Sequence, residues 1–264
     1  ILRVPAHKAA RCGVAKLSVD ARHGKPVLVY TMAITLKDEG EESAYAGASP
    51  CVCFTQPARF SFSVGDTALK TRPVVVGLGP AGLFAALLLA RSGFRPLVLE
   101  RGPELDERVK AVEHFEKTGE LNLNANIQFG EGGAGTFSDG KLTTRVGDPL
   151  CAFVTDAFLQ HGAPADIAWR QKPHVGTDLL RGIIRSIRQE IIALGGEVRF
   201  NTALTGLKIE NGALAGVETT AGDFACEQLI LAVGHSVRDT FAMLHGSGLP
   251  LECKPFSVGF RAEH

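Results

Sequence analysis

One stretch of 30 residues, from Arg72 to Arg101, constrains the fold of this chain more than any other part of the sequence. It reads RPVVVGLGPAGLFAALLLARSGFRPLVLER. The β-branched run at its start predicts a fully buried parallel strand, and the apolar segment after the glycines predicts a buried helix that Gly93 ends. A second strand follows at Leu97-Val98-Leu99, and Glu100 ends it. This order predicts a β-α-β unit of the dinucleotide-binding type.

The three glycines of the turn have separate predicted roles. Gly77 permits the tight turn, Gly79 lets the backbone approach a pyrophosphate, and Gly82 lets the helix pack close to the strand. The free N–H groups and the positive dipole end of the helix would then face the phosphates. Glu100, 18 residues beyond Gly82, can accept hydrogen bonds from a ribose diol. We therefore predict a bound dinucleotide, and the alternative is a Rossmann-like unit that has lost its ligand.

Charge and cysteine content argue against several other classes of protein. Lys plus Arg and Asp plus Glu both number 28, so no net field would attract nucleic acid or an acidic partner. The six cysteines are scattered without CxxC spacing, which favours reduced thiols in a cytoplasmic protein over a metal site. Residues 73–90 carry no charge, but three glycines and Pro80 interrupt them, so they predict strand, turn and helix instead of a membrane span.

The first 70 residues predict a small N-terminal α/β module. Two strands are expected at 16–22 and 27–36, joined by a turn at 23–26, and the polar segment 37–47 is expected to be a loop. Alternating apolar residues mark the second strand. The sequence of this module contains no motif that indicates a chemical function, so the module either docks on the main domain or binds a partner.

The region after the nucleotide unit contains two more amphipathic helices and a β-meander. The helix over 103–120 is expected to turn its charged residues to solvent; these are Glu104, Asp106, Glu107, Arg108, Lys110, Glu113, Glu116 and Lys117. A second helix is predicted from Thr177 to Leu194, and Thr177 can serve as its N-cap. Its apolar stripe consists of Leu180, Ile183, Ile184, Ile187, Ile191 and Leu194. Strands are predicted at 198–200, 204–209, 214–219 and 229–234.

A second glycine-rich segment covers residues 126–142 and reads NIQFGEGGAGTFSDGKL. Such a segment can present N–H groups to phosphate or let a flat ring come close. Its end resembles the start of a P-loop, but Leu142 stands where Ser or Thr would hold magnesium. A nucleophile elbow is a weaker match, because the spacing is wrong by one residue. A glycine-rich connection without a ligand is the remaining alternative.

Five segments, taken together, resemble a known family. They are the nucleotide unit, the second glycine-rich segment, KPHVGTD at 172–178, AVGHSVRDT at 232–240 and KPFSVGFRAEH at 254–264. In this order they resemble the bacterial FAD-dependent dehydrogenases, or NAD(P)/FAD-dependent oxidoreductases, over about residues 14–264. The resemblance implies an α/β fold of the glutathione-reductase type. Residues 71–264 would form an FAD/NAD(P)-binding Rossmann-like three-layer domain that includes a β-meander. Within this domain, residues 144–196 would form a helical segment on the substrate side.

The resemblance also implies FAD, not NAD, as the resident cofactor, and no metal. At the adenosine end of FAD, the resemblance implies Gly77, Gly79, Pro80, Ala81 and Gly82 at the pyrophosphate, Glu100 and Arg101 at the ribose, and Leu204 (or Ala203) at the adenine. Along the pyrophosphate and ribityl chain it implies Gly132, Gly133 and Ser138. It places Gly234 close to the cofactor, and Lys141, with Asp139, near the flavin ring. For Lys141 a surface ion pair is the alternative. His174 and His235 are expected to be structural hydrogen-bonding groups, and no catalytic residue is identified.

One feature of the family is not found. Its members carry a later strand that ends in Gly-Asp, whereas the Gly-Asp pairs at 147–148 and 222–223 do not follow buried strands. Because the chain stops at His264, where the family continues, we expect a fragment that lacks the C-terminal half.

The predicted function is a FAD-dependent oxidoreductase that exchanges electrons with an unidentified small organic substrate, with NAD(P)H as a possible transient donor. The sequence indicates neither the oligomeric state nor a nucleic-acid or membrane partner. Two alternatives stay open. One is an NAD(P)-binding dehydrogenase of simple Rossmann type, and the other is a non-catalytic module that binds FAD or a partner.

Overall fold

The computed structural model describes residues 4–22, 24–45, 49–55, 60–138, 140–142, 144, 146, 148 and 150–255. The chain divides into two compact units. Unit 1 comprises Ile1–Asp66 and Gly132–Glu190, and unit 2 comprises Thr67–Glu131 and Ile191–His264.

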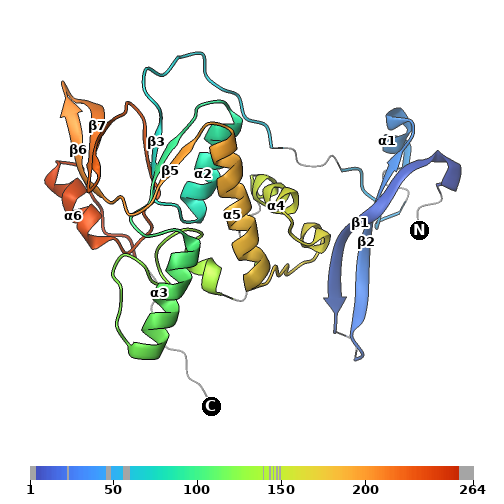
Figure 1. Ribbon diagram of the computed structural model, residues 1–264. Helices are drawn as coiled ribbons and strands as arrows, with labels where there is room; N and C mark the ends of the chain where they lie inside the picture. Colours follow the sequence, from blue (N-terminus) through green and yellow to red (C-terminus); the bar gives the residue numbers. More distant parts are fainter. Residues whose placement is uncertain are drawn as a thin grey trace. The chain divides into compact units, whose positions relative to one another are not determined.

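Four short parallel strands form the central sheet of unit 2, in the spatial order β5-β4-β3-β9. They are β3 (Val74–Val76), β4 (Leu97–Leu99), β5 (Glu197–Arg199) and β9 (Leu229–Leu231). Figure 1 labels β3 and β5 of this sheet. Every residue of β3 and β4 is buried, as expected for apolar strands at the centre of a parallel sheet. The predicted parallel strands are confirmed.

Helix α2 (Pro80–Arg91) returns the chain from β3 to β4. Pro80 occupies the first turn, where the missing N–H costs no hydrogen bond. Gly93 follows the helix with φ of +83°, the left-handed conformation that commonly ends a helix. The buried face of α2 consists of Gly82, Leu83, Ala86, Leu87 and Ala90.

An antiparallel meander forms the third layer of unit 2. Its strands are β6 (Leu204–Glu210), β7 (Ala213–Thr219) and β8 (Gly222–Ala225), in the order β6-β7-β8. Asn211 and Gly212, both with positive φ, make the tight turn between β6 and β7. The meander shares an apolar cluster with one face of the parallel sheet; its buried members are Val74, Val76, Leu97, Leu99, Leu204, Val217 and Cys226. Helix, parallel sheet and meander confirm the predicted Rossmann-like three-layer α/β fold.

The last strand of the sheet departs from its prediction. An apolar strand was expected over 229–234, but β9 covers only Leu229–Leu231. Because β9 stands at the edge of the sheet, Ile230 and Leu231 are 37% and 39% exposed. Helix α6 (Arg238–Gly246), which the sequence analysis did not predict, follows β9.

Helix α3 (Leu105–Thr118) confirms the predicted helix over 103–120. Gly119, with φ of +77°, ends it. The expectation that all of its charged residues face solvent is wrong for Arg108, which is fully buried together with Leu105 and Val112.

Unit 1 contains a two-stranded antiparallel ribbon of β1 (Ala9–Asp20) and β2 (Val27–Leu36). The second predicted strand is confirmed to the residue, and the first is longer than expected. Of the alternating apolar residues in β2 only Leu36 is buried. The predicted loop 37–47 is partly wrong, because a short 3-10 turn (Glu39–Glu41) and helix α1 (Glu42–Tyr45) lie there.

The rest of unit 1 is mainly helical. Helix α4 (Cys151–Gln160) was not predicted, whereas α5 (Thr177–Ala193) confirms the helix that was expected to start at Thr177. Five residues of the predicted apolar stripe are buried, but Leu194 lies beyond the helix and is 42% exposed. Among the residues that the structure describes, none of the helices has both the length and the apolar character of a membrane span.

The compact units differ from the predicted domains in one respect. The break after Asp66 falls near the predicted boundary at 70, but residues 132–190 belong to the same unit as the N-terminal ribbon. The roles assigned to the domains, a docking module and a substrate-side segment at 144–196, stay predictions.

Candidate functional site

The carboxyl ends of three parallel strands bring the predicted nucleotide-binding residues of unit 2 to one edge of the sheet. The turn Gly77–Gly82 follows β3, Glu100 and Arg101 follow β4, and Gly234 follows β9. In open parallel sheets ligands bind in the crevice at this edge. These residues therefore lie at the strand ends where such ligands bind, and their contact with a cofactor stays a prediction.

The three glycines of the turn differ in what requires them. Gly77 has φ of +97°, and a Cβ there would lie 2.5 Å from the carbonyl oxygen of Ala232. A Cβ on Gly82 would overlap the carbonyl oxygen of Gly77, so helix α2 can approach the strand only with glycine at this place. Gly79 has an ordinary φ of −67°, and a Cβ there would meet nothing within 4 Å. The packing of the chain explains Gly77 and Gly82, whereas Gly79 leaves open space at the N-terminus of α2.

Helix α2 begins without a side-chain cap, since its N-cap residue is Gly79. Pro80 has no N–H. The N–H groups of Ala81 and Gly82 have no acceptor in the described part of the chain. Leu83 is the first residue of α2 whose N–H has one, since it donates to the Gly79 carbonyl at 2.9 Å. A helix of 12 residues that leaves these donors at an open turn is suited to an anionic group.

Glu100 joins this turn to the end of β4. Its side chain is 4% exposed. One carboxylate oxygen accepts the N–H of Leu78 at 2.7 Å, and the other accepts the N–H of Gly102 at 2.8 Å. A carboxylate offers about four lone-pair positions, so each oxygen can accept one more hydrogen bond. The group is therefore held rigidly and can still receive two hydroxyl donors.

Arg101 forms an ion pair beside Glu100. Its guanidinium lies 2.5 Å from the carboxylate of Asp239, at the start of α6. Burial alone would raise the pKa of Asp239, but the hydrogen bonds from Arg101 and from the Thr240 N–H outweigh it and hold that pKa below its ordinary value. The pair connects β4 to α6, and the predicted place of Arg101 beside a ribose stays a prediction.

The sequence analysis missed Arg108, which organises the segment leading to the second glycine-rich loop. Its guanidinium donates to the carbonyl of Asn126 at 3.0 and 3.1 Å, to that of Ile127 at 3.1 Å and to that of Glu131 at 2.6 Å. In return, a carboxylate oxygen of Glu131 accepts the N–H of Leu105 at 2.8 Å. Spacing could have revealed this residue, since Leu105, Arg108 and Val112 lie at i, i+3 and i+7 on one helix face.

The second glycine-rich loop belongs to unit 1 from Gly132 onward, where it packs on α5. Gly132 and Gly133 have φ of +79° and +68°, and a Cβ on Gly132 would overlap the side chain of Ile184. The carbonyl of Ser138 accepts the hydroxyl of Thr177 at 3.0 Å. The loop therefore has a defined backbone against the helix, as a ligand-binding loop requires.

The remaining predicted site residues are placed as follows. Lys141 is exposed, and its backbone forms an antiparallel bridge with His174. Leu204 starts β6 with its side chain in the apolar cluster, and Gly234 has φ of +78°. The ring of His235 lies 2.5 Å from the Ser236 hydroxyl. Asp139 lies outside the described residues. The roles of all these residues at a cofactor stay predictions.

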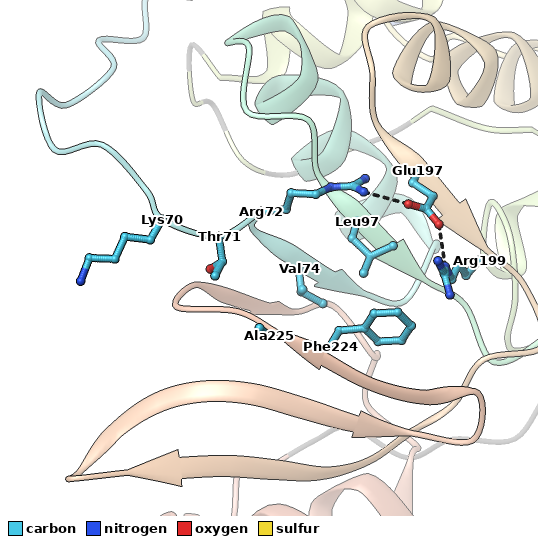
Figure 2. Close-up of a pocket in the computed structure, with 9 residues that line it drawn as sticks. All are labelled: Lys70, Thr71, Arg72, Val74, Leu97, Glu197, Arg199, Phe224 and Ala225. Carbon is cyan, nitrogen blue, oxygen red and sulfur yellow. Dashed lines mark hydrogen bonds and ion pairs between the residues drawn. The ribbon is translucent and has the colours of Figure 1, made fainter.

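An open cavity lies at the other end of the parallel sheet (Figure 2). Glu197 accepts hydrogen bonds there from Arg72 at 2.8 Å and from Arg199 at 2.6 Å, and the Arg199 guanidinium lies over the ring of Phe224. Because the glycine turn follows the last residue of β3, this cavity is separate from the turn by the length of the strand. It is lined by Lys70, Thr71, Arg72, Val74, Leu97, Glu197, Arg199, Phe224 and Ala225.

Comparison with known proteins finds no family model that matches the chain. The chain is 52% identical, over 204 residues, to an uncharacterized protein of Clostridium beijerinckii, covering 77% of this chain and 38% of that protein. It is 31% identical, over 147 residues, to digeranylgeranylglycerophospholipid reductase 1 of Methanococcoides burtonii, covering 55% of this chain and 32% of the reductase. The chain thus spans between 32% and 38% of the length of these relatives.

Among solved structures, the chain is similar to Thermovibrio ammonificans THI4. The TM-score is 0.45 at 16% sequence identity, and the match covers 68% of this chain and 64% of THI4.

Proposed function

We propose that this chain provides the FAD-binding core of a FAD-dependent oxidoreductase that acts on a small organic substrate. The observation that carries the proposal is the pairing of an open glycine turn at Gly79 with a buried carboxylate at Glu100. The turn suits a pyrophosphate, and the carboxylate suits the diol of the adjoining ribose. Both groups belong to one ligand, and they occur at neighbouring strand ends.

The residues of unit 2 fit FAD in three respects. The open space at Gly79 would admit a pyrophosphate, and the N–H groups of Ala81 and Gly82 would donate to it. The oxygens of Glu100, each already holding one backbone N–H, would accept the ribose hydroxyls. FAD would supply the redox chemistry, while the protein binds, orients and shields it.

A second observation favours FAD over a nicotinamide dinucleotide. A simple NAD(P) site needs only the first glycine turn, whereas this chain has a second glycine-rich loop with two consecutive glycines of positive φ. The name of the Methanococcoides burtonii relative, a reductase, is consistent with redox chemistry. Because the chain spans about a third of that relative's length, the complete activity, its substrate and any NAD(P)H donor belong to the proposal.

Cofactor identification tests this function. We expect the purified protein to show the visible absorption of an oxidised flavin and to release FAD on denaturation. Replacement Glu100→Gln should weaken FAD binding by about 10- to 100-fold, since charge-assisted hydrogen bonds contribute about 1.5–3 kcal/mol. The matched control is Glu113→Gln, on the exposed side of α3, which should bind FAD as the parent does.

Three outcomes would contradict the proposal. The first is a colourless protein that cannot be reconstituted with FAD but binds NADH, which would favour the nicotinamide alternative. The second is a Glu100→Gln protein with unchanged FAD affinity, which would remove Glu100 from the site. The third is flavin that binds but is never reduced by any donor, which would favour the non-catalytic module.

A further inference from the structure

Helix α5 turns an arginine toward the second glycine-rich loop of unit 1. Thr177, Arg181 and Ile184 lie at i, i+4 and i+7, so they share one face of the helix. Thr177 donates its hydroxyl to the Ser138 carbonyl at 3.0 Å, and the side chain of Ile184 packs where a Cβ on Gly132 would stand. Arg181 lies between these two contacts, on the face that an apolar side chain would ordinarily occupy.

The guanidinium of Arg181 is only partly satisfied by the chain. Its central carbon lies 5.2 Å from the centre of the Phe137 ring, a cation–π contact. Its Nε–H is buried, and nothing in the described part of the chain accepts a hydrogen bond from it. A guanidinium has five N–H donors in a rigid fork, and this one meets an aromatic face and no carboxylate among the described residues.

Arg108 in unit 2 differs from Arg181 in this respect. Arg108 is buried more completely, but backbone carbonyls of the segment 126–131 accept hydrogen bonds from all three of its guanidinium nitrogens. Burial of a polar group without a partner is unfavourable, and such groups are rare in folded proteins. The described part of the chain thus gives the charge of Arg181 no carboxylate and its Nε–H no acceptor, and the charge and fork geometry of a guanidinium suit an anion outside the chain.

We propose that Arg181 is an anion-recognition residue, which binds a phosphate or carboxylate group of a ligand lying against the loop 132–138. Both groups present two oxygens at the spacing of the guanidinium fork. The inference rests on the proposed function and extends it, because it gives the small organic substrate an anionic group that Arg181 recognises. The ring of Phe137 and the hydroxyl contact of Thr177 hold the helix face and the loop in place around the guanidinium.

The first test uses flavin-free protein, so that it does not depend on the proposed function. Inorganic pyrophosphate and acetate are titrated by calorimetry at constant ionic strength into the parent, Arg181→Gln and Arg181→Lys. Parent protein should bind at least one of the two anions, Arg181→Gln should bind it at least about tenfold more weakly, and Arg181→Lys should lie between. The control is Arg170→Gln, which removes an exposed arginine of unit 1 paired with Asp166 at 3.2 Å and should bind as the parent does.

A second arm distinguishes a substrate anion from the cofactor. Because the anion belongs to the substrate, Arg181→Gln should bind FAD and riboflavin as the parent does and should lose only the anion that the parent binds, pyrophosphate or acetate. An FAD affinity that falls about tenfold in Arg181→Gln, with unchanged riboflavin binding, would overturn the assignment to the substrate. Anion binding that depends on Arg181 in a protein that never binds FAD would refute the proposed function alone.

The proposal fails if Arg181→Gln and Arg181→Lys keep the parent affinity for pyrophosphate, acetate and FAD. It also fails if the parent binds neither anion. Circular dichroism and the melting temperature show whether Arg181→Gln is folded. Should it be unfolded, Arg181→Lys, which retains the charge and the long aliphatic stem, decides the question by the same titrations.

Discussion

Gly130 lies directly against the buried side chain of Arg108. A Cβ at Gly130 would come within 2.7 Å of both Cδ and Nε of the arginine, and the backbone there has φ of +116°. The carbonyls that Arg108 binds flank this glycine in the sequence. The segment 126–131 is thus wrapped around a buried cation, and Gly132 of the glycine-rich loop follows it directly.

Replacement Gly130→Ala should destabilise the protein by about 1–3 kcal/mol, since it combines a strained φ with a collision against a side chain that cannot leave. Urea unfolding measures the change. The matched control is Gly135→Ala, where a Cβ would meet nothing within 4 Å and little change is expected. Equal unfolding midpoints for the two variants would show that the segment 126–131 accommodates the added methyl group without loss of stability.

Removal of the buried cation at Arg108 should lower the free energy of unfolding by more than Gly130→Ala does. Arg108→Met removes the guanidinium that donates to the carbonyls of Asn126, Ile127 and Glu131, which implies a loss of about 3 kcal/mol in the free energy of unfolding. Lys110→Met, two residues further along α3, removes an exposed ion pair with Glu107 and should cost less than about 1 kcal/mol. Hydrogen exchange of residues 126–131 locates the effect. If exchange increases uniformly along the chain in Arg108→Met, the arginine does not act on this segment in particular.

Two glycines of the first turn should respond oppositely to alanine. Gly79→Ala should keep the free energy of unfolding within about 1 kcal/mol of the parent and should weaken FAD binding, because the new methyl group enters the open space at the turn. Gly82→Ala should be strongly destabilised, because its Cβ overlaps the Gly77 carbonyl. Thermal melts with a FAD titration distinguish them. Full FAD affinity in Gly79→Ala would mean that the pyrophosphate lies elsewhere.

Acid should weaken unit 2 through Glu197. Hydrogen bonds from Arg199, and then from Arg72, hold the pKa of Glu197 below its ordinary value of 4.5. Because the folded pKa is the lower one, the carboxylate contributes stability above pH 4.5, and this contribution disappears as the pH falls through the folded pKa. Both partners are partly exposed, so the effect is small. Melting temperatures between pH 7 and 3 should fall less steeply in Glu197→Gln, and parallel curves for both proteins would contradict this.

His161 should stabilise the pairing of α4 and α5 in unit 1. Its ring nitrogens lie 2.8 Å from the Ser186 hydroxyl and 2.7 Å from the Glu190 carboxylate, and its side chain is largely buried. His161→Phe should lower the free energy of unfolding by about 1–3 kcal/mol, since the Ser186 hydroxyl and the Glu190 carboxylate each lose a hydrogen bond. Chemical denaturation measures this. His114→Phe, whose ring is exposed beside Glu120, is the matched control, and a similar loss in both variants would exclude a specific role for His161.

The sequence by itself determined the elements and the turn that organise unit 2. Three consecutive valines, a glycine motif and an uncharged helical segment specify strand, turn and helix through contacts within a few residues, and β3, α2 and β4 lie where they were expected. Periodicity likewise located α3, α5 and the meander. The edge position of β9 escaped prediction, because it depends on which strands lie beside it and not on its own apolar residues.

Tertiary structure alone decided which charged residues leave solvent and what they meet there. Arg108 belongs to a run of charges that reads as a solvent-facing surface, yet carbonyls 18 to 23 residues away accept its hydrogen bonds. Arg181 stands in an ordinary amphipathic helix, and only the path of the loop containing Phe137 shows that its Nε is buried without an acceptor. The reason is physical: local backbone preference sets secondary structure, whereas the burial of a charge depends on groups that the fold brings together from distant parts of the chain.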